Sequence, residues 1–411
     1  MPVGRLHIDS IAAGGDGVAR ADGMVVFVPR TAPGDVAQVS YTPKGRFARG
    51  KLVALDTPSA DRVTPACDHY DGDHCGGCQL QHIRYEAQCD AKREIVHDAM
   101  VRIAHRDDAP PPEVRPAAAP WRYRRKLTLA LRSRGHGWTA GLHPYDDPAS
   151  VFALHDCPIT EERVLAAWRE VLDVGDSLPN AAELRAAVRY DDAGAGSLVV
   201  EGGDRWTGAQ RLLDRAPSLE SIWWKPARAP RATPAASRRP HGSPAASFSQ
   251  VNAAVAAALG AHVVERVRAH QPATVIDAYA GTGHTAIALA SDACRVVAIE
   301  LDADASAWCA ARLPNGSRAV AARVEDALPA ALPADVVILN PPRAGVDRRV
   351  TDALSDARAT TRAVLYVSCD PATLARDVAR LPGWRIASLV SFDMFPQTAH
   401  VETVCELVPE P

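Results

Sequence analysis

The chain has 411 residues, of which 47% are hydrophobic and 23% charged, as in folded proteins with sizeable cores. This balance excludes disordered, collagen-like and coiled-coil chains, and the formal net charge of -3 excludes a globally basic nucleic-acid coat. No apolar run is long enough for a membrane helix, and the first residues, MPVGRLHIDS, lack the apolar core of a signal peptide. We therefore expect a cytoplasmic, monomeric protein of two to three domains that does not enter a membrane.

Residues 1–58 predict a small β domain. Short β-rich runs at 24–28, 36–41 and 50–55 are separated by Gly, Pro and Asp turn signals, a pattern that fits a five-stranded barrel of the oligonucleotide-binding (OB) kind. The basic residues of this part are candidates for RNA contact, although a solvated barrel face would carry them as well: Arg20, Arg30, Lys44, Arg46, Arg49 and Lys51.

The nine cysteines are unevenly placed, with four of them between positions 67 and 89. The count is odd and the reducing cytosol disfavours structural disulfides, so a cluster of this kind indicates a metal site before a disulfide.

Residues 59–240 predict a central α+β domain. Its helix over 85–105 is expected to pack on the C-terminal domain. The segment 121–134, with six basic and no acidic residues, predicts strands that could contact phosphates. The proline-rich and basic segment 225–244 predicts a linker or loop.

From residue 245 to residue 411 strand-like and Ala-rich helical stretches alternate. This alternation predicts a doubly wound, Rossmann-like α/β domain with a mostly parallel sheet, in which ligands bind at the carboxyl ends of the strands. The predicted helices are 253–269, 284–291, 303–313 and 371–381.

The first strand of this domain ends in VIDAYAGTGHTA, which predicts a cofactor loop. Gly281 and Gly283 form a GxG turn that also fits a dinucleotide site. However, Asp277 precedes the loop where nicotinamide-binding loops carry an apolar residue, and Glu300 ends the next strand, where it can hold ribose hydroxyls. An acid at this place suits a cationic sulfonium, so S-adenosylmethionine is favoured over NAD.

Cys369 ends the strand AVLYVSC and precedes a predicted helix. A free cysteine is more often a small buried hydrophobe, the interpretation that we adopt for Cys294, Cys309 and Cys405. At a strand end and a helix start, however, backbone N–H groups and the helix dipole are expected to favour the thiolate of Cys369.

Five segments together resemble the RNA uracil-C5 methyltransferases. They are FSQVN (248–252), DAYAGTG (277–283), NPPRAG (340–345), SCDPATLARD (368–377) and DMFPQTAHVE (393–402). Their order and spacing match that family over essentially the whole chain, and the N-terminal barrel resembles its TRAM domain.

The resemblance implies a methyl transfer to C5 of a uridine, with Cys369 as the nucleophile that adds to C6 and Glu402 as the base that removes the C5 proton. It also implies that several residues line the cofactor and uracil site, beside Asp277, Gly281 and Gly283: Gln250, Tyr279, His284, Glu300, Asp326 and Asn340.

Asn340 departs from the resemblance, because the family usually has Asp before PPR. NPP also occurs in methyltransferases of exocyclic amino groups, which leaves that reaction as an alternative. Such enzymes need no cysteine, so Cys369 and Glu402 argue against it. The other alternative is a non-catalytic RNA-binding iron–sulfur module.

The cysteine cluster also resembles that of family members with an iron–sulfur centre, but seven residues rather than five separate Cys67 from Cys75. The resemblance implies a [4Fe–4S] cluster held by Cys67, Cys75, Cys78 and Cys157, whereas four thiolates could also hold zinc. Because no second CxxC is present, zinc is less favoured, and Cys89 is interpreted as a core residue.

The expected partner is structured RNA. The barrel and the cysteine cluster resemble ribosomal RNA enzymes more than the shorter transfer RNA enzymes, so ribosomal RNA is favoured and transfer RNA is the alternative.

Overall fold

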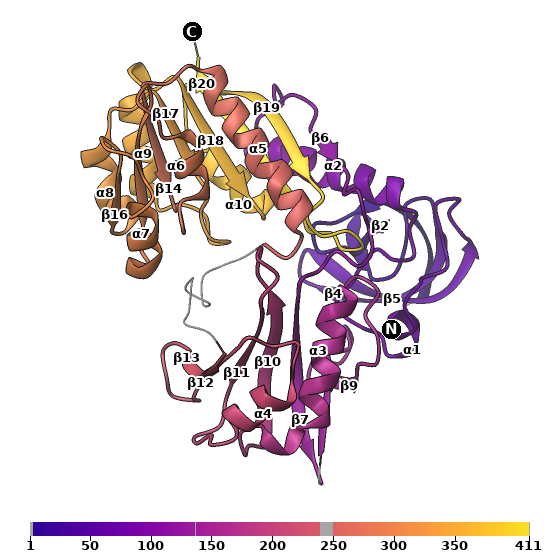
Figure 1. Ribbon diagram of the computed structural model, residues 1–411. Helices are drawn as coiled ribbons and strands as arrows, with labels where there is room; N and C mark the ends of the chain where they lie inside the picture. Colours follow the sequence, from indigo (N-terminus) through magenta and orange to yellow (C-terminus); the bar gives the residue numbers. More distant parts are fainter. Residues whose placement is uncertain (1–2, 136, 239–249, 411) are drawn as a thin grey trace.

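The computed structural model describes residues 3–135, 137–238 and 250–410. Three β-sheets organise the chain: a closed five-stranded barrel, a seven-stranded sheet and an eight-stranded sheet (Figure 1). Among the described residues, none of the helices is both long and apolar enough to span a membrane.

The N-terminal barrel is closed in the order β1-β2-β3-β5-β4. Side chains that alternate along the strands, such as Leu6, Ile8, Val26, Val28 and Val39, fill its interior. The predicted runs correspond to the third, fourth and fifth strands. The barrel consists of β1 Val3–Ile11, β2 Gly17–Ala21, β3 Met24–Val28, β4 Val36–Lys44 and β5 Phe47–Thr57.

The central unit is a seven-stranded sheet, ordered β13-β12-β11-β10-β7-β8-β9, with helices on one face. Val164 and Trp168 of α3 and Leu212 of α4 pack on inward-facing strand residues such as Leu129 and Val188. Its strands are β7 Lys126–Arg134, β8 Gly137–Leu142, β9 Phe152–Ala153, β10 Glu183–Tyr190, β11 Gly196–Glu201, β12 Ser221–Lys225 and β13 Thr233–Ser237. Its helices are α1 Asp68–Gly72, α3 Glu162–Asp173, the short η1 Gly175–Ser177 and α4 Ala209–Arg215.

The C-terminal unit contains the eight-stranded sheet, in the order β16-β15-β14-β17-β18-β20-β19-β6. The first five strands of this order are parallel, whereas β20 runs antiparallel to both of its neighbours. The strands are β14 Thr274–Ala278, β15 Arg295–Glu300, β16 Arg318–Ala321, β17 Val336–Leu339, β18 Ala363–Ser368, β19 Trp384–Phe392 and β20 Glu402–Pro409.

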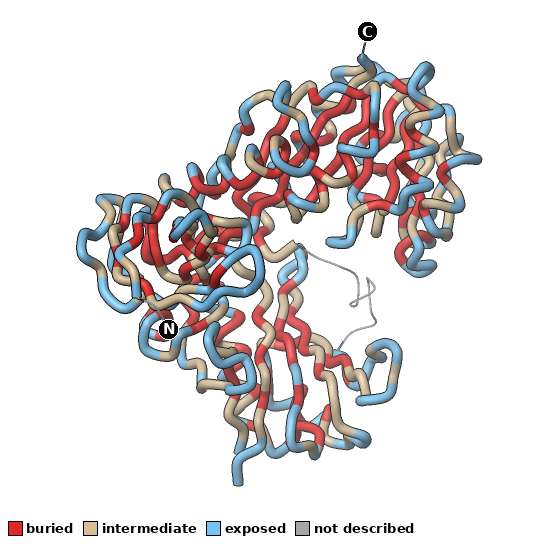
Figure 2. The backbone as a smooth tube through the Cα atoms, turned by 180° about the vertical axis from the view of Figure 1, so that it is seen from behind, coloured by how far each residue is buried: buried red, intermediate tan, exposed pale blue. Residues whose placement is uncertain are grey.

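Helices cover both faces of this sheet (Figures 1 and 2), because successive strand residues point to opposite sides. Val275 lies in the core under α5, α6 and α7, whereas Ile276 lies in the core under α8, α9 and α10. The expected doubly wound arrangement is therefore observed. The helices are α5 Ala253–Ala269, α6 His284–Leu289, α7 Ala303–Ala310, α8 Val324–Ala331, α9 Arg348–Asp356, the short η2 Ala357–Ala359 and α10 Pro371–Val378.

Two segments before the central sheet are built into the C-terminal unit. The helix predicted over 85–105 spans Tyr85–Arg102 (α2), and its Met100 lies in the core that α10 also lines. The strand β6, Glu113–Arg115, pairs with β19 at the sheet edge. The sequence analysis included β6 in the central domain, because three residues carry too little pattern to indicate their partner strand.

Candidate active site

Cys369 and Glu402 are brought together at the carboxyl edge of the eight-stranded sheet. The antiparallel register of β18 and β20 places Ser368 opposite Thr403, so the next pair along this register is Cys369 and Glu402. Because β20 runs opposite to the parallel strands, its first residue lies at the edge where they end. Cys369 is half-buried and Glu402 is buried.

Arg343 is a third charged group at this place. Its guanidinium lies near both groups and acts to lower the pKa of the Cys369 thiol and that of the Glu402 carboxyl. The loop that carries Arg343 is held by α10, since Thr373 Oγ1 donates to the Arg343 carbonyl at 3.2 Å and Arg376 donates to the Ala344 carbonyl at 2.7 Å. Arg343 lies in the NPPRAG segment and had no role predicted from the sequence. The available signal was a cation four residues after the end of a buried strand.

Burial raises the pKa of Glu402 to about 7, against the opposing effect of Arg343. Burial and the Glu402 carboxylate also raise the pKa of the Cys369 thiol above its usual value, and Arg343 only partly offsets them. Any lowering by the backbone at the helix start is therefore outweighed by burial and by Glu402. Cys369 lies one residue before the N-cap of α10. The N-cap residue is Asp370, and its carboxylate accepts a hydrogen bond from the backbone N–H of Thr373 at 2.8 Å.

The predicted cofactor loop follows β14. Asp277 is fully buried, its pKa is raised to about 7 by burial and by Glu300, and its Oδ2 has no hydrogen-bond partner among the described residues. Glu300 accepts hydrogen bonds from the backbone N–H groups of Gly281 and Asp302, both at 2.8 Å. Gly283 has a φ of 79°, and a Cβ there would approach the Cys309 sulfur to 2.1 Å, so only glycine fits.

Other predicted cofactor residues lie around the same edge. Tyr279, half-buried with a φ of 62°, follows β14, and exposed His284 begins α6. Asn340 is exposed directly after β17, and its N–H donates to the Ala278 carbonyl at 3.2 Å. Asp326, in the first turn of α8, accepts from Arg349 at 2.8 Å. Gln250 is half-buried, two residues before the N-cap of α5, while Phe248 and Ser249 of the same motif lie outside the described residues.

Cys67, Cys75, Cys78 and Cys157 are all buried in one place, and each thiol acts electrostatically on the other three. Burial, followed by the neighbouring thiols, raises the pKa of Cys67 to about 11 and that of Cys78 to about 12. Nevertheless, in the part of the chain that the structure describes, no three His, Cys, Asp or Glu side chains are arranged to hold a metal ion.

The surroundings of the four cysteines fit a bound group of negative charge. The Arg30 guanidinium stacks on the Tyr70 ring at 3.3 Å from its centroid, and its Nη2 donates to the Cys75 carbonyl at 2.7 Å. Its Nη1 is buried without a hydrogen-bond partner among the described residues, and the charges of Cys75 and Cys78 act on it. A partly buried cation beside Cys75 and Cys78 suits the net negative charge of a thiolate-ligated centre.

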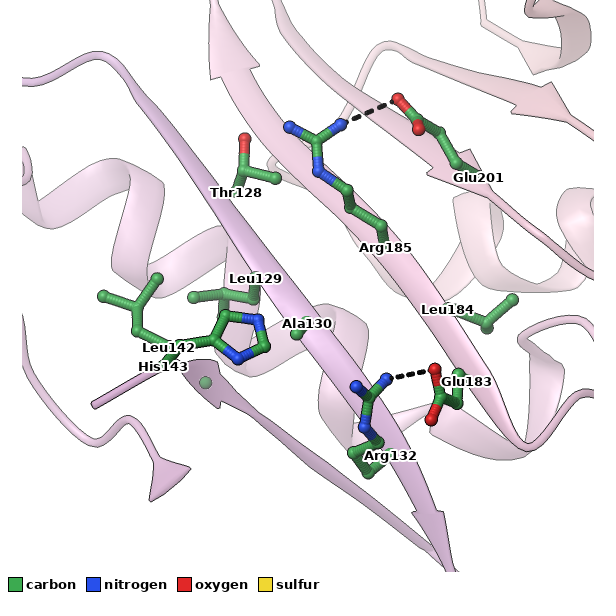
Figure 3. A pocket seen from close by; sticks show the side chains of 11 residues that line it. Thr128, Leu129, Ala130, Arg132, Leu142, His143, Glu183, Leu184, Arg185 and Glu201 are labelled. Carbon is green, nitrogen blue, oxygen red and sulfur yellow. Dashed lines mark hydrogen bonds and ion pairs between the residues drawn. The ribbon is translucent and has the colours of Figure 1, made fainter. Parts of the chain in front are cut away.

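A separate depression of about 480 Å³ opens on the face of the central sheet away from α3 and α4 (Figure 3). Its charged side chains pair with one another: Arg132 with Glu183 at 2.8 Å and Arg185 with Glu201 at 3.0 Å. It contains neither of the two candidate catalytic residues, and we place the candidate active site at the edge of the eight-stranded sheet instead.

Comparison with known proteins gives a consistent result. Residues 315–408 match the family model described as tRNA (Uracil-5-)-methyltransferase. An uncharacterized RNA methyltransferase of Thermosynechococcus vestitus is 32% identical over 98% of this chain and 97% of its own length, and one of Bacillus cereus is 30% identical over 95% and 93%. The same fold is found in the crystal structure of Pyrococcus abyssi tRNA (uracil-54, C5)-methyltransferase with S-adenosyl-L-homocysteine. The TM-score is 0.72 and the sequence identity 22%, and the match covers 99% of this chain and 100% of the other.

Proposed function

This chain belongs to the tRNA (uracil-5-)-methyltransferase family of RNA methyltransferases, and from that premise we propose that it transfers a methyl group from S-adenosylmethionine to C5 of a uridine in structured RNA. The observation that carries the proposal is the Cys369 thiol in register with the buried Glu402 carboxyl, with Arg343 beside both. Methyl transfer to an exocyclic amine needs neither the Cys369 thiol nor the Glu402 carboxyl.

In the proposed reaction, the target base leaves its stack and enters the site. The Cys369 thiolate forms a bond to C6 of the uracil, and the electron pair of the C5–C6 double bond moves into the ring as an enolate. C5 of this enolate is the nucleophile that attacks the methyl group of the co-substrate. The methyl–sulfur bond breaks, and its electron pair leaves with the sulfur, which becomes a neutral thioether. Glu402 then takes the C5 proton, and the released electron pair re-forms the double bond and expels the sulfur of Cys369 from C6. Arg343 stabilises the sulfur as a thiolate before addition and after elimination.

When bound, S-adenosylmethionine supplies an electrophilic methyl group. The residues that would hold it are Asp277, whose unpaired and buried oxygen suits a cationic ligand, and Glu300, which ends the neighbouring strand. Tyr279, His284, Asp326, Asn340 and Gln250 belong to the same proposal.

We expect turnover to rise with pH through about 7. Glu402 accepts a proton only when ionised, and its pKa is raised to about 7, so the competent fraction falls roughly tenfold for each pH unit below that value. The raised pKa of Cys369 also makes turnover rise with pH, because only the thiolate adds to C6. Multiple-turnover rates (kcat) measured between about pH 5.5 and about pH 8.5 test this, and rates that do not change between about pH 6 and about pH 8 would contradict the assignment of Glu402.

We propose ribosomal RNA as the substrate and the cytoplasm as the place of action, supported by the N-terminal barrel, by the cysteine cluster and by basic residues such as Arg124 and Lys126 ahead of and on β7. The test compares 5-methyluridine in ribosomal and transfer RNA from wild-type cells and from cells without the gene. Loss confined to ribosomal RNA supports the proposal, and loss in transfer RNA reassigns the substrate. Unchanged 5-methyluridine with loss of an N-methylated base favours the reaction suggested by Asn340.

We also propose that Cys67, Cys75, Cys78 and Cys157 hold a [4Fe–4S] cluster. The four neighbouring thiols and the Arg30 cation, whose Nη1 is buried, support this. Four thiolates could also hold one zinc ion, so the metal content of the purified protein decides between the two groups.

Anaerobically purified protein is expected to be brown and to contain about four irons per chain. Replacing any one of the four cysteines by serine should bleach the visible absorption and lower the thermal midpoint, whereas Cys89→Ser and Cys309→Ser should leave the absorption intact. Chemical reduction should not change the methyl-transfer rate, since the proposed reaction uses no electron. Colourless protein with one tightly held zinc would refute the cluster.

A further inference from the structure

The loop that joins β19 to β20 leads directly into Glu402 and is held by the N-terminal part of the chain. At its start, Asp393 forms an ion pair with Lys92 of α2 at 2.5 Å, and both side chains are fully buried. Tyr85 donates to the other oxygen of Asp393 at 2.7 Å, and Lys92 also donates to the Phe395 carbonyl at 3.2 Å. Further along, Tyr123 donates to the carbonyl of Pro396 at 3.0 Å.

Gln397 is held still more closely. Its backbone N–H donates to Oε1 of Gln88 at 3.0 Å, and Nε2 of Gln88 donates to Oε1 of Gln397 at 2.9 Å. The Gln397 carbonyl accepts from the N–H groups of Gln79 and Leu80 at 3.1 and 3.0 Å. Gln397 has a φ of 70°, a conformation that costs energy for a residue with a side chain and persists only where its surroundings enforce it.

By contrast, none of the described residues forms a hydrogen bond with the Glu402 carboxyl, and among them the charge of Arg343 acts on it. Its position is therefore set by the backbone of β20 and of the loop ahead of it. Gln88 and Gln397 are buried, and Gln88 also donates to the carbonyls of Leu80 and Ile83, which fixes its amide to the segment that follows Cys78.

We infer that Gln88, through its paired hydrogen bonds with Gln397, is the residue that positions Glu402 for proton removal from C5. The inference rests on the proposed function. Gln88 touches no reacting atom, so it is a positioning residue. Proton transfer falls steeply with misplacement, and an error of about 1 Å costs roughly 100-fold. Nucleophilic addition and methyl transfer depend on Cys369 and the cofactor edge, so they depend less on this loop.

The test is Gln88→Met, which keeps the length of the side chain and removes its hydrogen bonds. We expect kcat to fall roughly 10- to 100-fold with KM for RNA changed less than about threefold, and a covalent protein–RNA adduct to accumulate on denaturing gels. Gln397→Gly is the second variant, because glycine adopts the positive φ without strain and removes only the amide partner. Gln210→Met is the matched control, since Gln210 is exposed and bonds only Asp214, at 2.9 Å.

Adduct in Gln88→Met or in Gln397→Gly, and none in Gln210→Met, supports the inference. If Gln88→Met does not fold, Gln397→Gly decides the question alone. Wild-type turnover in a folded variant, or equal loss of methyl transfer and elimination without adduct, overturns it. Glu402→Gln, run in parallel, separates the two proposals. Adduct in Glu402→Gln but not in Gln88→Met or Gln397→Gly contradicts only the positioning role. No adduct and no 5-methyluridine in any sample contradicts the proposed function.

Discussion

Replacing Cys369 by alanine is expected to reduce the formation of 5-methyluridine by at least about 10⁴-fold while leaving RNA affinity within about twofold. Without the sulfur–C6 bond, C5 of uracil is not nucleophilic enough to attack the methyl group, and nothing else at this edge of the sheet supplies that bond. RNA affinity survives because contacts to phosphates and neighbouring bases do not depend on the thiol.

The measurement combines single-turnover methylation of total RNA with a binding titration. Cys294→Ala is the control, because Cys294 is a half-buried thiol at an isolated bridge with Ser291, outside the candidate active site. We expect that variant to turn over like the wild type. More than a trace of methylation by Cys369→Ala in the presence of intact RNA binding would refute the assignment of the nucleophile.

The second large effect concerns Glu402→Gln, which should complete one methyl transfer and then stall. The amide cannot take the C5 proton, so elimination of Cys369 is blocked and turnover is expected to fall by roughly 10³-fold or more. The enzyme should therefore remain bound to methylated RNA through the sulfur–C6 bond. A slowly migrating band on denaturing gels measures this species.

Three comparisons check the origin of that band. The band should be absent without S-adenosylmethionine if methyl transfer must precede the stall. It should also be absent in the double variant that carries Cys369→Ala in addition. Finally, it should be absent in Glu410→Gln, which changes an exposed glutamate near the chain end. Normal turnover by Glu402→Gln without a band would show that another group removes the proton.

Local pattern was sufficient to predict much of this molecule. The β-rich runs at 24–28 and 36–41, bounded by turn residues, indicated barrel strands, and the apolar runs at 295–300 and 363–369 indicated parallel strands, because the residue types that favour strands are visible locally. The helix 253–269 was predicted to the residue, and the structure has an Asn252 cap at its start. The GxG loop and the strand-end position of Cys369 were visible for the same reason.

Proximity between distant segments left no such trace in a single sequence. The pairing of Glu402 with Cys369 follows from the antiparallel register of β20, and the role of Arg343 follows from the loop that α10 holds. The helix start next to Cys369 is a local feature that could be predicted, whereas the burial and the facing carboxylate that raise the pKa of its thiol arise only when the sheet is assembled.

The same limit applies to the N-terminal segments. The sequence of residues 85–102 predicts a helix but not the partners of Gln88 and Lys92. These partners lie in a loop about 300 residues further along the chain. The sequence by itself determined the elements and the reactive groups that they carry. Only the tertiary structure decided which groups meet, because hydrogen-bond register, burial and opposing charge are properties of pairs of segments and not of either segment alone.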